Sequence, residues 1–358
     1  MKRIAGAVIW AAMLVPQPLA AQAGDGFDLE PYGFLRLGLE VEPESSGQGD
    51  GFLLYDARFG LKGEVGFLFD YDLGLEYDRS SEAIELLDAR LSFPLGSSPV
   101  HVDVGGFRSP VSREATTDKD LLGTAERSQF ALALAPGRQV GLQVAGDAAD
   151  TRVHWAVGLF NGNGLRWEND DDAFLVAGRV VFNSVGDLEF FEDFVVEAGI
   201  SFAATQDDSQ AVLPVGLGFA DYDGDRQIYG AEARLAYNGW TLAGEFVRAR
   251  YDDPVGSGTI EAEGFTADLR HLLWGVFDLG VRYDAFEPAF APGGGAPADN
   301  DFVVLSLRAA PGPYAHVGMQ YAIGVDGATR GIDTSLDGTN TAPPLADGQF
   351  LLFLQVAF

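Results

Sequence analysis

Charged side chains of both signs are concentrated between Ser109 and Gly137, in a segment that could act on ions. These charges are, in order, Arg113, Glu114, Asp118, Lys119, Asp120, Glu126 and Arg127. Arg108 and Arg138 flank the segment. Charges of this kind set ion selectivity when they line a narrow, partly desolvated channel. On a flexible surface loop they would only be hydrated, and the two flanking arginines would serve equally well as anchors at a membrane interface.

The histidines give little support to hydrolytic chemistry. A serine hydrolase needs a serine and a histidine close together, with an acid or amide that orients the histidine. No G-x-S-x-G motif lies near any of the four histidines, His101, His154, His271 and His316. The other three histidines, apart from His271, fall on polar strand faces among charged residues. A position in the lining of a lumen is the simpler interpretation of these residues. We expect no catalytic residues, and a hydrolase is the least favoured alternative.

Two acidic clusters resemble metal-binding turns only in part. The run D-Y-D-G-D at 221–225 looks like half of a calcium loop, and 168–172 is similar. An EF-hand also needs flanking helices, and the alternating pattern around these turns predicts none. The chain has no cysteine, so disulfides and thiolate metal sites are excluded. We therefore expect solvated turns, with no metal site and no cofactor.

The charge balance and the first residues indicate an exported protein that does not bind nucleic acid. The formal net charge is −30, and such a field repels a polyanion. Lys2 and Arg3 precede an apolar run from Ile4 to Val15, and the small-residue pattern A-Q-A ends at Ala23. This arrangement is typical of a secretory signal peptide over residues 1–23. The exported part, 24–358, is predicted to form a single domain.

Period-two alternation of apolar and polar residues recurs along the chain and predicts β-strands. The clearest case is Phe69–Asp78, where apolar side chains alternate with charged ones and a glycine. In a barrel that spans a membrane, the apolar face points to lipid and the polar face to the lumen. Segments of this kind lie near 31–41, 52–65, 68–78, 84–93, 100–108, 138–146, 152–160, 173–182, 194–203, 228–237, 240–251, 260–270, 276–284, 301–309, 314–324 and 349–358.

The connections between these segments alternate between long and short. Long ones lie at 109–137, 204–227, 285–300 and 325–348, and short ones at 94–99, 148–149, 238–239 and 311–313. Outer-membrane barrels have short periplasmic turns and long external loops, and an even number of strands. We therefore predict an all-β fold, a transmembrane antiparallel β-barrel of about sixteen strands in a bacterial outer membrane. A soluble β-sandwich or propeller would instead bury apolar faces between its sheets.

The chain ends on an apolar strand, Gln349–Phe358, with no polar tail. An exposed strand edge of this kind is a liability in a soluble protein, whereas a barrel removes the edge by pairing its last strand with its first. The terminal Phe358 also resembles the assembly signal of bacterial outer-membrane proteins, which implies recognition by the barrel-assembly machinery.

Five sequence motifs in the first half of the chain resemble one family. They are F-R-S-P-V-S-R-E (107–114), E-R-S (126–128), A-P-G-R-Q-V-G-L-Q-V-A-G (135–146), W-A-V-G-L-F-N-G-N-G (155–164) and A-G-R-V-V-F (177–182). Together they resemble the phosphate-selective porin O/P family of Gram-negative outer membranes. The resemblance implies a sixteen-stranded barrel, usually a homotrimer, that conducts small anions and contacts lipid and lipopolysaccharide.

One feature departs from that family. The phosphate selectivity of that family is associated with clustered lysines and a ladder of arginines. After residue 23 this chain has only two lysines, Lys62 and Lys119. Alternation directs both basic and acidic residues into the lumen, and its predicted lining includes Arg58, Lys62, Asp70, Asp72, Arg90, Arg234 and Arg282. A wall of mixed charge does not by itself select phosphate.

By this strand count the segment 109–137 is the third external loop, which in porins of this strand number commonly folds into the pore. We predict a pore constriction formed by Arg108, Arg113, Glu114, Lys119, Glu126 and Arg127. The predicted function is an outer-membrane porin, a water-filled channel for passive diffusion of small hydrophilic solutes and ions, with phosphate or other anions among them. A non-channel barrel with a structural or adhesive role is the main alternative.

Overall fold

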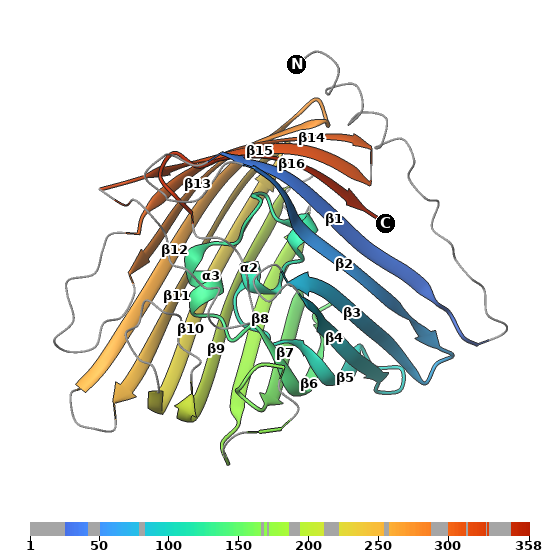
Figure 1. Ribbon diagram of the computed structural model, residues 1–358. Coiled ribbons are helices and arrows are strands. Elements are labelled where there is room, and N and C mark those ends of the chain that lie inside the picture. Colours follow the sequence, from blue (N-terminus) through green and yellow to red (C-terminus); the bar gives the residue numbers. More distant parts are fainter. Residues whose placement is uncertain are drawn as a thin grey trace.

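In the part of the chain that the structure describes, sixteen antiparallel strands form one closed barrel, which confirms the predicted fold (Figure 1). This computed structural model describes residues 26–41, 51–78, 83–165, 168–169, 172–185, 194–210, 222–253, 258–287, 300–312, 314–326, 328 and 345–358. The predicted signal peptide at 1–23 lies outside the described residues, as do residues 170, 171 and 221 of the two acidic turns.

Each strand pairs with its neighbours in sequence. The strands are β1 (Glu30–Val41), β2 (Gly51–Val65), β3 (Phe69–Asp78), β4 (Ala83–Pro94), β5 (Val100–Arg108), β6 (Arg138–Ala148), β7 (Val153–Phe160), β8 (Leu175–Val185), β9 (Val195–Gln210), β10 (Tyr222–Tyr237), β11 (Trp240–Asp253), β12 (Gly258–Leu273), β13 (Phe277–Glu287), β14 (Phe302–Gly312), β15 (Ala315–Gly324) and β16 (Phe350–Ala357). None of the described helices combines the length and the apolar character needed to cross a membrane.

The barrel closes between β1 and β16. Their register runs from Phe34 opposite Ala357 to Val41 opposite Phe350. Beyond that ladder, Gly33 and Phe358 exchange two backbone hydrogen bonds of 2.9 Å each. Lipid offers no partners for backbone polar groups, so a spanning sheet has to be closed in this way.

The strand faces follow the predicted alternation over most of the barrel. Leu352 on β16 and Phe358, which comes directly after this strand, are exposed on the outer face. Leu351, Phe353 and Gln355 of β16 are buried on the inner face. The terminal phenylalanine therefore lies on the lipid side, as the sequence predicts.

Part of the inner face is apolar, which the sequence does not predict. Towards the end of the barrel that carries the long loops, Phe160, Leu175, Ile228, Val247 and Phe286 form one buried cluster with residues of the loop 109–137. These wall residues come from strands β7, β8, β10, β11 and β13. They face protein rather than water, so an apolar inner face is stable there.

Several strands extend beyond their apolar parts. The ladder of β9 and β10 continues to Tyr222 opposite Gln210, which shortens the predicted connection 204–227 to 211–221. On the same end, the connections 79–82 and 254–257 are also short, so the long–short rhythm is not strict. Strand extensions carry polar residues, such as Arg226 paired with Asp207 at 3.0 Å, and an apolar pattern cannot detect them.

Deletion of Phe358 is expected to lower the yield of folded barrel. Gly33 would lose both backbone partners, and a buried polar group without a partner costs about 1–3 kcal/mol. Heat-modifiable mobility in outer-membrane fractions measures the folded fraction. The variant Phe358→Ala keeps the backbone bonds and isolates the contribution of the aromatic ring. An unchanged yield on deletion would contradict the role of this residue in closure and assembly.

Candidate pore constriction

The loop between β5 and β6 lies inside the barrel, as predicted (Figure 1). It contains the short helices α2 (Arg113–Thr116), η2 (Lys119–Leu121) and α3 (Gln129–Ala133). We call residues 109–137 the third loop. Its side chains and backbone contact strands on opposite sides of the lumen.

An apolar seat holds α3 against the wall. Phe130 is fully buried and belongs to the cluster formed with Phe160, Val247 and Phe286. Phe130 packs on Gly264 of β12, which has no side chain. An added Cβ at this glycine would lie only 2.2 Å from the Phe130 Cβ. The missing side chain therefore lets the helix approach the strand closely.

Polar groups fix both ends of α2. Glu245 on β11 accepts hydrogen bonds from the backbone N–H groups of Arg113 (2.8 Å) and Glu114 (3.0 Å). The Ser112 hydroxyl accepts from the Ala115 N–H at 3.1 Å. At the other end, the Arg127 guanidinium donates to the carbonyls of Glu114, at 3.1 Å, and Thr117. These contacts satisfy helix-end groups that have no partner within the helix.

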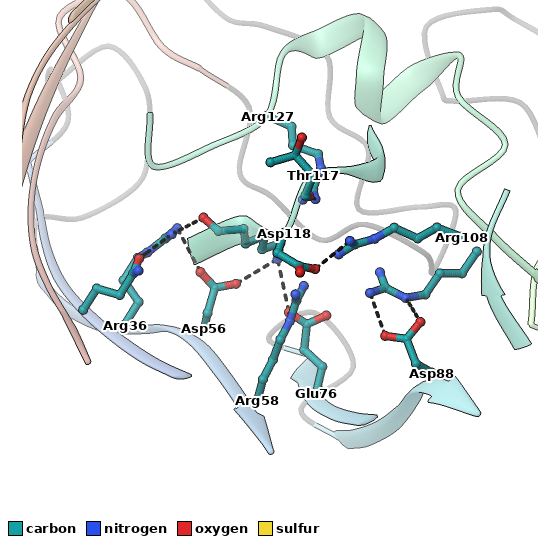
Figure 2. A network of polar contacts seen from close by, with 12 residues as sticks. Arg36, Asp56, Arg58, Glu76, Asp88, Arg108, Thr117, Asp118 and Arg127 are labelled. Atoms are coloured by element: carbon teal, nitrogen blue, oxygen red, sulfur yellow. Dashed lines mark hydrogen bonds and ion pairs between the residues drawn. The ribbon is translucent and has the colours of Figure 1, made fainter. Parts of the chain in front are cut away.

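Arg36 on β1 joins the wall to the third loop. Its guanidinium lies 3.0 Å from Asp56 on β2 and donates to Gln355 on β16 at 2.8 Å. It also donates to two loop carbonyls, Ala125 at 2.6 Å and Lys119 at 3.1 Å. Figure 2 shows this network from close by.

Lys119 extends the same network to β3. Its ammonium group lies 2.8 Å from Asp56 and 3.2 Å from Glu76. Glu76 also pairs with Arg58 at 2.9 Å. Two carboxylates and two cations are thus interleaved where the loop meets β2 and β3 (Figure 2). Buried charges are stable only when they are paired in this manner.

On the opposite wall, Arg282 of β13 holds the loop. It pairs with Glu114 at 3.2 Å and with Asp284 at 3.2 Å, and it donates to the Thr124 hydroxyl at 2.7 Å. Arg308 on β14 donates to the Leu122 carbonyl at 3.1 Å. Together with Arg36 and Glu245, these residues attach the loop around much of the circumference.

Two cavities lie between the loop and strands β1 to β8. One cavity of about 480 Å³ is lined by residues that include Asp72, Asp88, Arg90, Arg108, Asp118 and Arg179. A second, of about 300 Å³, is lined by residues that include Arg58, Lys62, Asp72, Asp88, Asp118 and Arg138. On the β11–β13 side, the space next to Arg113, Glu245 and Arg282 is only about 60 Å³.

The six predicted constriction residues divide into two groups. Lys119, Glu126 and Arg127 are buried. Lys119 and Arg127 contact wall or loop atoms through their side chains, and the Glu126 carbonyl accepts from Arg282, so all three brace the loop. Arg108, Arg113 and Glu114 are partly exposed. Only Arg108 lines the larger cavity, where it pairs with Asp118 of the loop at 2.7 Å.

The predicted lumen residues lie on the inner wall, and most are in ion pairs. Arg58 and Arg282 have the partners given above. The other distances are 3.5 Å for Lys62–Glu30, 3.8 Å for Arg90–Asp72 and 3.2 Å for Arg234–Glu197. Asp70 is exposed close to the turn between β2 and β3. Arg138, which the sequence left open as an interface anchor, instead pairs with Asp88 through two contacts of 3.0 Å.

Sequence reasoning missed the anchoring roles of Arg36, Glu245 and Gln355, the last of which donates to the Asp120 carbonyl of the loop at 3.3 Å. Alternation places each of them on an inward face and gives no sign that a loop backbone would meet it. The signal that was available is indirect, since a polar residue inside a barrel needs a partner.

Three loop residues have shifted pKa values, and burial raises the pKa of one of them, Glu126, above its ordinary value. Burial and the neighbouring positive charges of Arg108, Arg58 and Arg138 lower the pKa of Arg127 to about 9, so the group stays protonated at neutral pH. Burial opposes ionisation of Asp118, but the charge and hydrogen bond of Arg108 outweigh it and hold its pKa below the ordinary value. Asp118 is therefore negative at neutral pH.

The histidines in the larger cavity pair with carboxylates. His154 lies 2.5 Å from Asp147, and His101 lies 3.5 Å from Asp103. No serine lines this cavity within the described part of the chain. Across the same described residues, no group of three or more histidine and carboxylate side chains is arranged to hold a metal ion.

A family model described as phosphate-selective porin O and P matches residues 42–289. The chain belongs to this family. The match covers most of the barrel and includes the third loop, and it agrees with the resemblance that the sequence motifs carry. A search of curated proteins finds no match.

Solved structures of outer-membrane proteins and porins share the fold. OmpT of Vibrio cholerae in its trimer form is 15% identical, covers 93% of this chain and 100% of its own, and has a TM-score of 0.64. The anion-selective porin from Comamonas acidovorans is 13% identical, with the same coverages and TM-score. OmpF of Salmonella typhi, in complex with daunomycin, is 13% identical, covers 93% and 98%, and has a TM-score of 0.61. Identities this low establish the barrel fold alone.

The substitution Gly264→Val is expected to loosen the third loop. The added side chain would overlap Phe130, and overpacking of this kind costs about 1–3 kcal/mol. Limited trypsin digestion should then cleave within 109–137 of the folded barrel, whereas the wild type resists. Gly244→Val is a matched control, because an added Cβ there meets only the Thr266 carbonyl oxygen, at 3.2 Å. Equal resistance of both variants would refute the role of the apolar seat.

Proposed function

We propose that this protein is a diffusion porin of the Gram-negative outer membrane, a water-filled channel for small hydrophilic solutes and ions. Membership of the porin family and the closed barrel support a channel. The cavities beside the third loop support a passage along strands β1 to β8, because they are larger than the space on the opposite side.

The pairing of charges along this passage supports weak selectivity. Each basic group that lines the two cavities has a carboxylate partner, as described above for Arg58, Lys62, Arg90, Arg108 and Arg138, and Arg179 pairs with Glu232 at 2.5 Å. A strong preference for a multivalent anion requires a continuous positive field along a narrow path. Paired charges supply a field that alternates in sign over short distances.

A preference for phosphate or another anion is the second candidate. The family description favours it, and so do the guanidinium groups of Arg58, Arg108 and Arg138, whose positive charges are felt together at Arg127. In our proposal their partners reduce this field, so any anion preference of the passage is small.

Purified protein in planar bilayers tests the proposal. We expect stepwise conductance, with a chloride-to-potassium permeability ratio within about threefold of one, as a charge-paired passage implies. Micromolar phosphate should leave the chloride current unchanged. Absence of conductance would reject the channel and favour a structural or adhesive barrel. Strong anion preference with block by micromolar phosphate would favour the second candidate.

We also propose a homotrimer, by analogy with the trimer form of OmpT. Unheated, detergent-solubilised protein should therefore have about three times the mass of one chain by light scattering, as closed cyclic symmetry implies. Covalent cross-linking should yield a trimer band that is lost on heating before the reaction. A single-chain mass under all mild conditions would contradict this assembly.

A further inference from the structure

The two cavities beside the third loop share a common border. Asp72, Asp88 and Asp118 line both of them. We call the region around these three carboxylates the neck. Arg58, Arg90, Arg108 and Arg138 line one cavity or the other, and three of them pair directly with a neck carboxylate. A direct path from one cavity to the other runs past this set of charges.

Most ion pairs at the neck join one strand to another. Arg58 on β2 pairs with Glu76 on β3, Arg90 on β4 pairs with Asp72 on β3, and Arg138 on β6 pairs with Asp88 on β4. The Arg138–Asp88 pair is bidentate, which adds geometric specificity. Both members of each pair are therefore fixed by the hydrogen-bonded wall.

The Arg108–Asp118 pair is different, because it joins the wall to the third loop. Asp118 lies between α2 and η2, and its side chain is 60% exposed, against 15% for Arg108. The structure gives the pair a single contact of 2.7 Å, between the Arg108 Nη1 and one Asp118 oxygen. The Arg108 Nη2 is buried and has no hydrogen-bond partner among the described residues.

We propose that Asp118 is a specificity-determining residue, which masks the charge of Arg108 and thereby sets the ion preference at the neck. This inference rests on the proposed channel function. With Asp118 in place, a passing ion meets a nearly neutral pair. Without it, Arg108 presents an uncompensated positive charge in addition to the paired guanidinium groups of Arg58 and Arg138. One loop carboxylate then decides whether the passage is nearly unselective or prefers anions.

Reversal potentials in a potassium chloride gradient test this inference. Asp118→Asn should raise the chloride-to-potassium permeability ratio about fivefold, the order expected for one unit charge roughly 7 Å from the ion path in water. Arg108→Gln should lower the ratio by a similar factor, because it leaves Asp118 unmasked. The double variant removes both charges and should return close to the wild-type ratio, as a double-mutant cycle requires for a coupled pair.

Two further variants serve as controls. Asp150→Asn makes the same chemical change in the exposed turn between β6 and β7, away from the neck, and should leave the ratio unchanged. Asp118→Glu keeps the charge and should keep the wild-type ratio. Heat-modifiable mobility verifies that each variant is folded, and Arg108→Gln tests the claim independently if Asp118→Asn fails to fold.

The outcomes separate this inference from the proposed function. A wild type that conducts, with Asp118→Asn and Arg108→Gln both at the wild-type ratio, would overturn the inference and leave the channel intact. A change in conductance without a change in ratio would make Asp118 only a positioning residue for the loop, which also overturns it. A wild type that never conducts would overturn the proposed function, and the inference with it.

Discussion

One buried side chain, Arg36, links the seam where the barrel closes to the third loop. Its guanidinium bridges β1 to Asp56 on β2 and Gln355 on β16, the strands on either side of it. The same group holds two carbonyls of the loop. Both Arg36 and Asp56 are buried, and removal of one partner from such a pair typically costs about 3–5 kcal/mol. The seam of the barrel and the obstruction inside it are therefore a single unit.

The loop is held by different forces on its two sides. Towards β11–β13, α3 packs on an apolar wall, and Glu245 and Arg282 bind its neighbouring backbone and side chains. Towards β1–β3, ion pairs of Arg36 and Lys119 hold it. Between these attachments the larger cavity lies beside the loop along β3 to β8, where Arg108 and Arg179 still reach Asp118 and Thr116 of the loop. The proposed passage thus lies beside this part of the loop.

Sequence patterns predicted the barrel because a strand in lipid must show an apolar outer face and a closed ladder. They also predicted the inward third loop, since its charges of both signs match a lumen. They could not predict which loop charges face water, because Lys119 and Arg127 are buried by contacts with distant strands or within the loop itself. The sequence also could not predict the apolar inner face near Val247. Alternation assigns residues to the two faces of a strand but does not indicate what covers the inner face.

The sequence also could not predict side-chain contacts between strands that are not adjacent in the barrel. Tyr32 on β1 reaches Asp72 on β3 at 2.6 Å, because β2 has a glycine between them at position 60. A Cβ at that glycine would lie 2.2 Å from the tyrosine ring. Arg138 on β6 likewise reaches Asp88 on β4. Such pairs depend on register and on missing side chains together, and only the folded barrel brings them together.

Cysteine accessibility tests most directly the claim that ions pass between the third loop and strands β1 to β8. The chain contains no cysteine, so a single introduced thiol reacts without background. Arg90, whose side chain is 41% exposed, lines the larger cavity, whereas Thr266, 5% exposed, lines the small space on the opposite side. A charged thiosulfonate reagent should rapidly reduce the current through Arg90→Cys channels and leave Thr266→Cys channels unaffected. Equal or faster modification of Thr266→Cys would contradict the account.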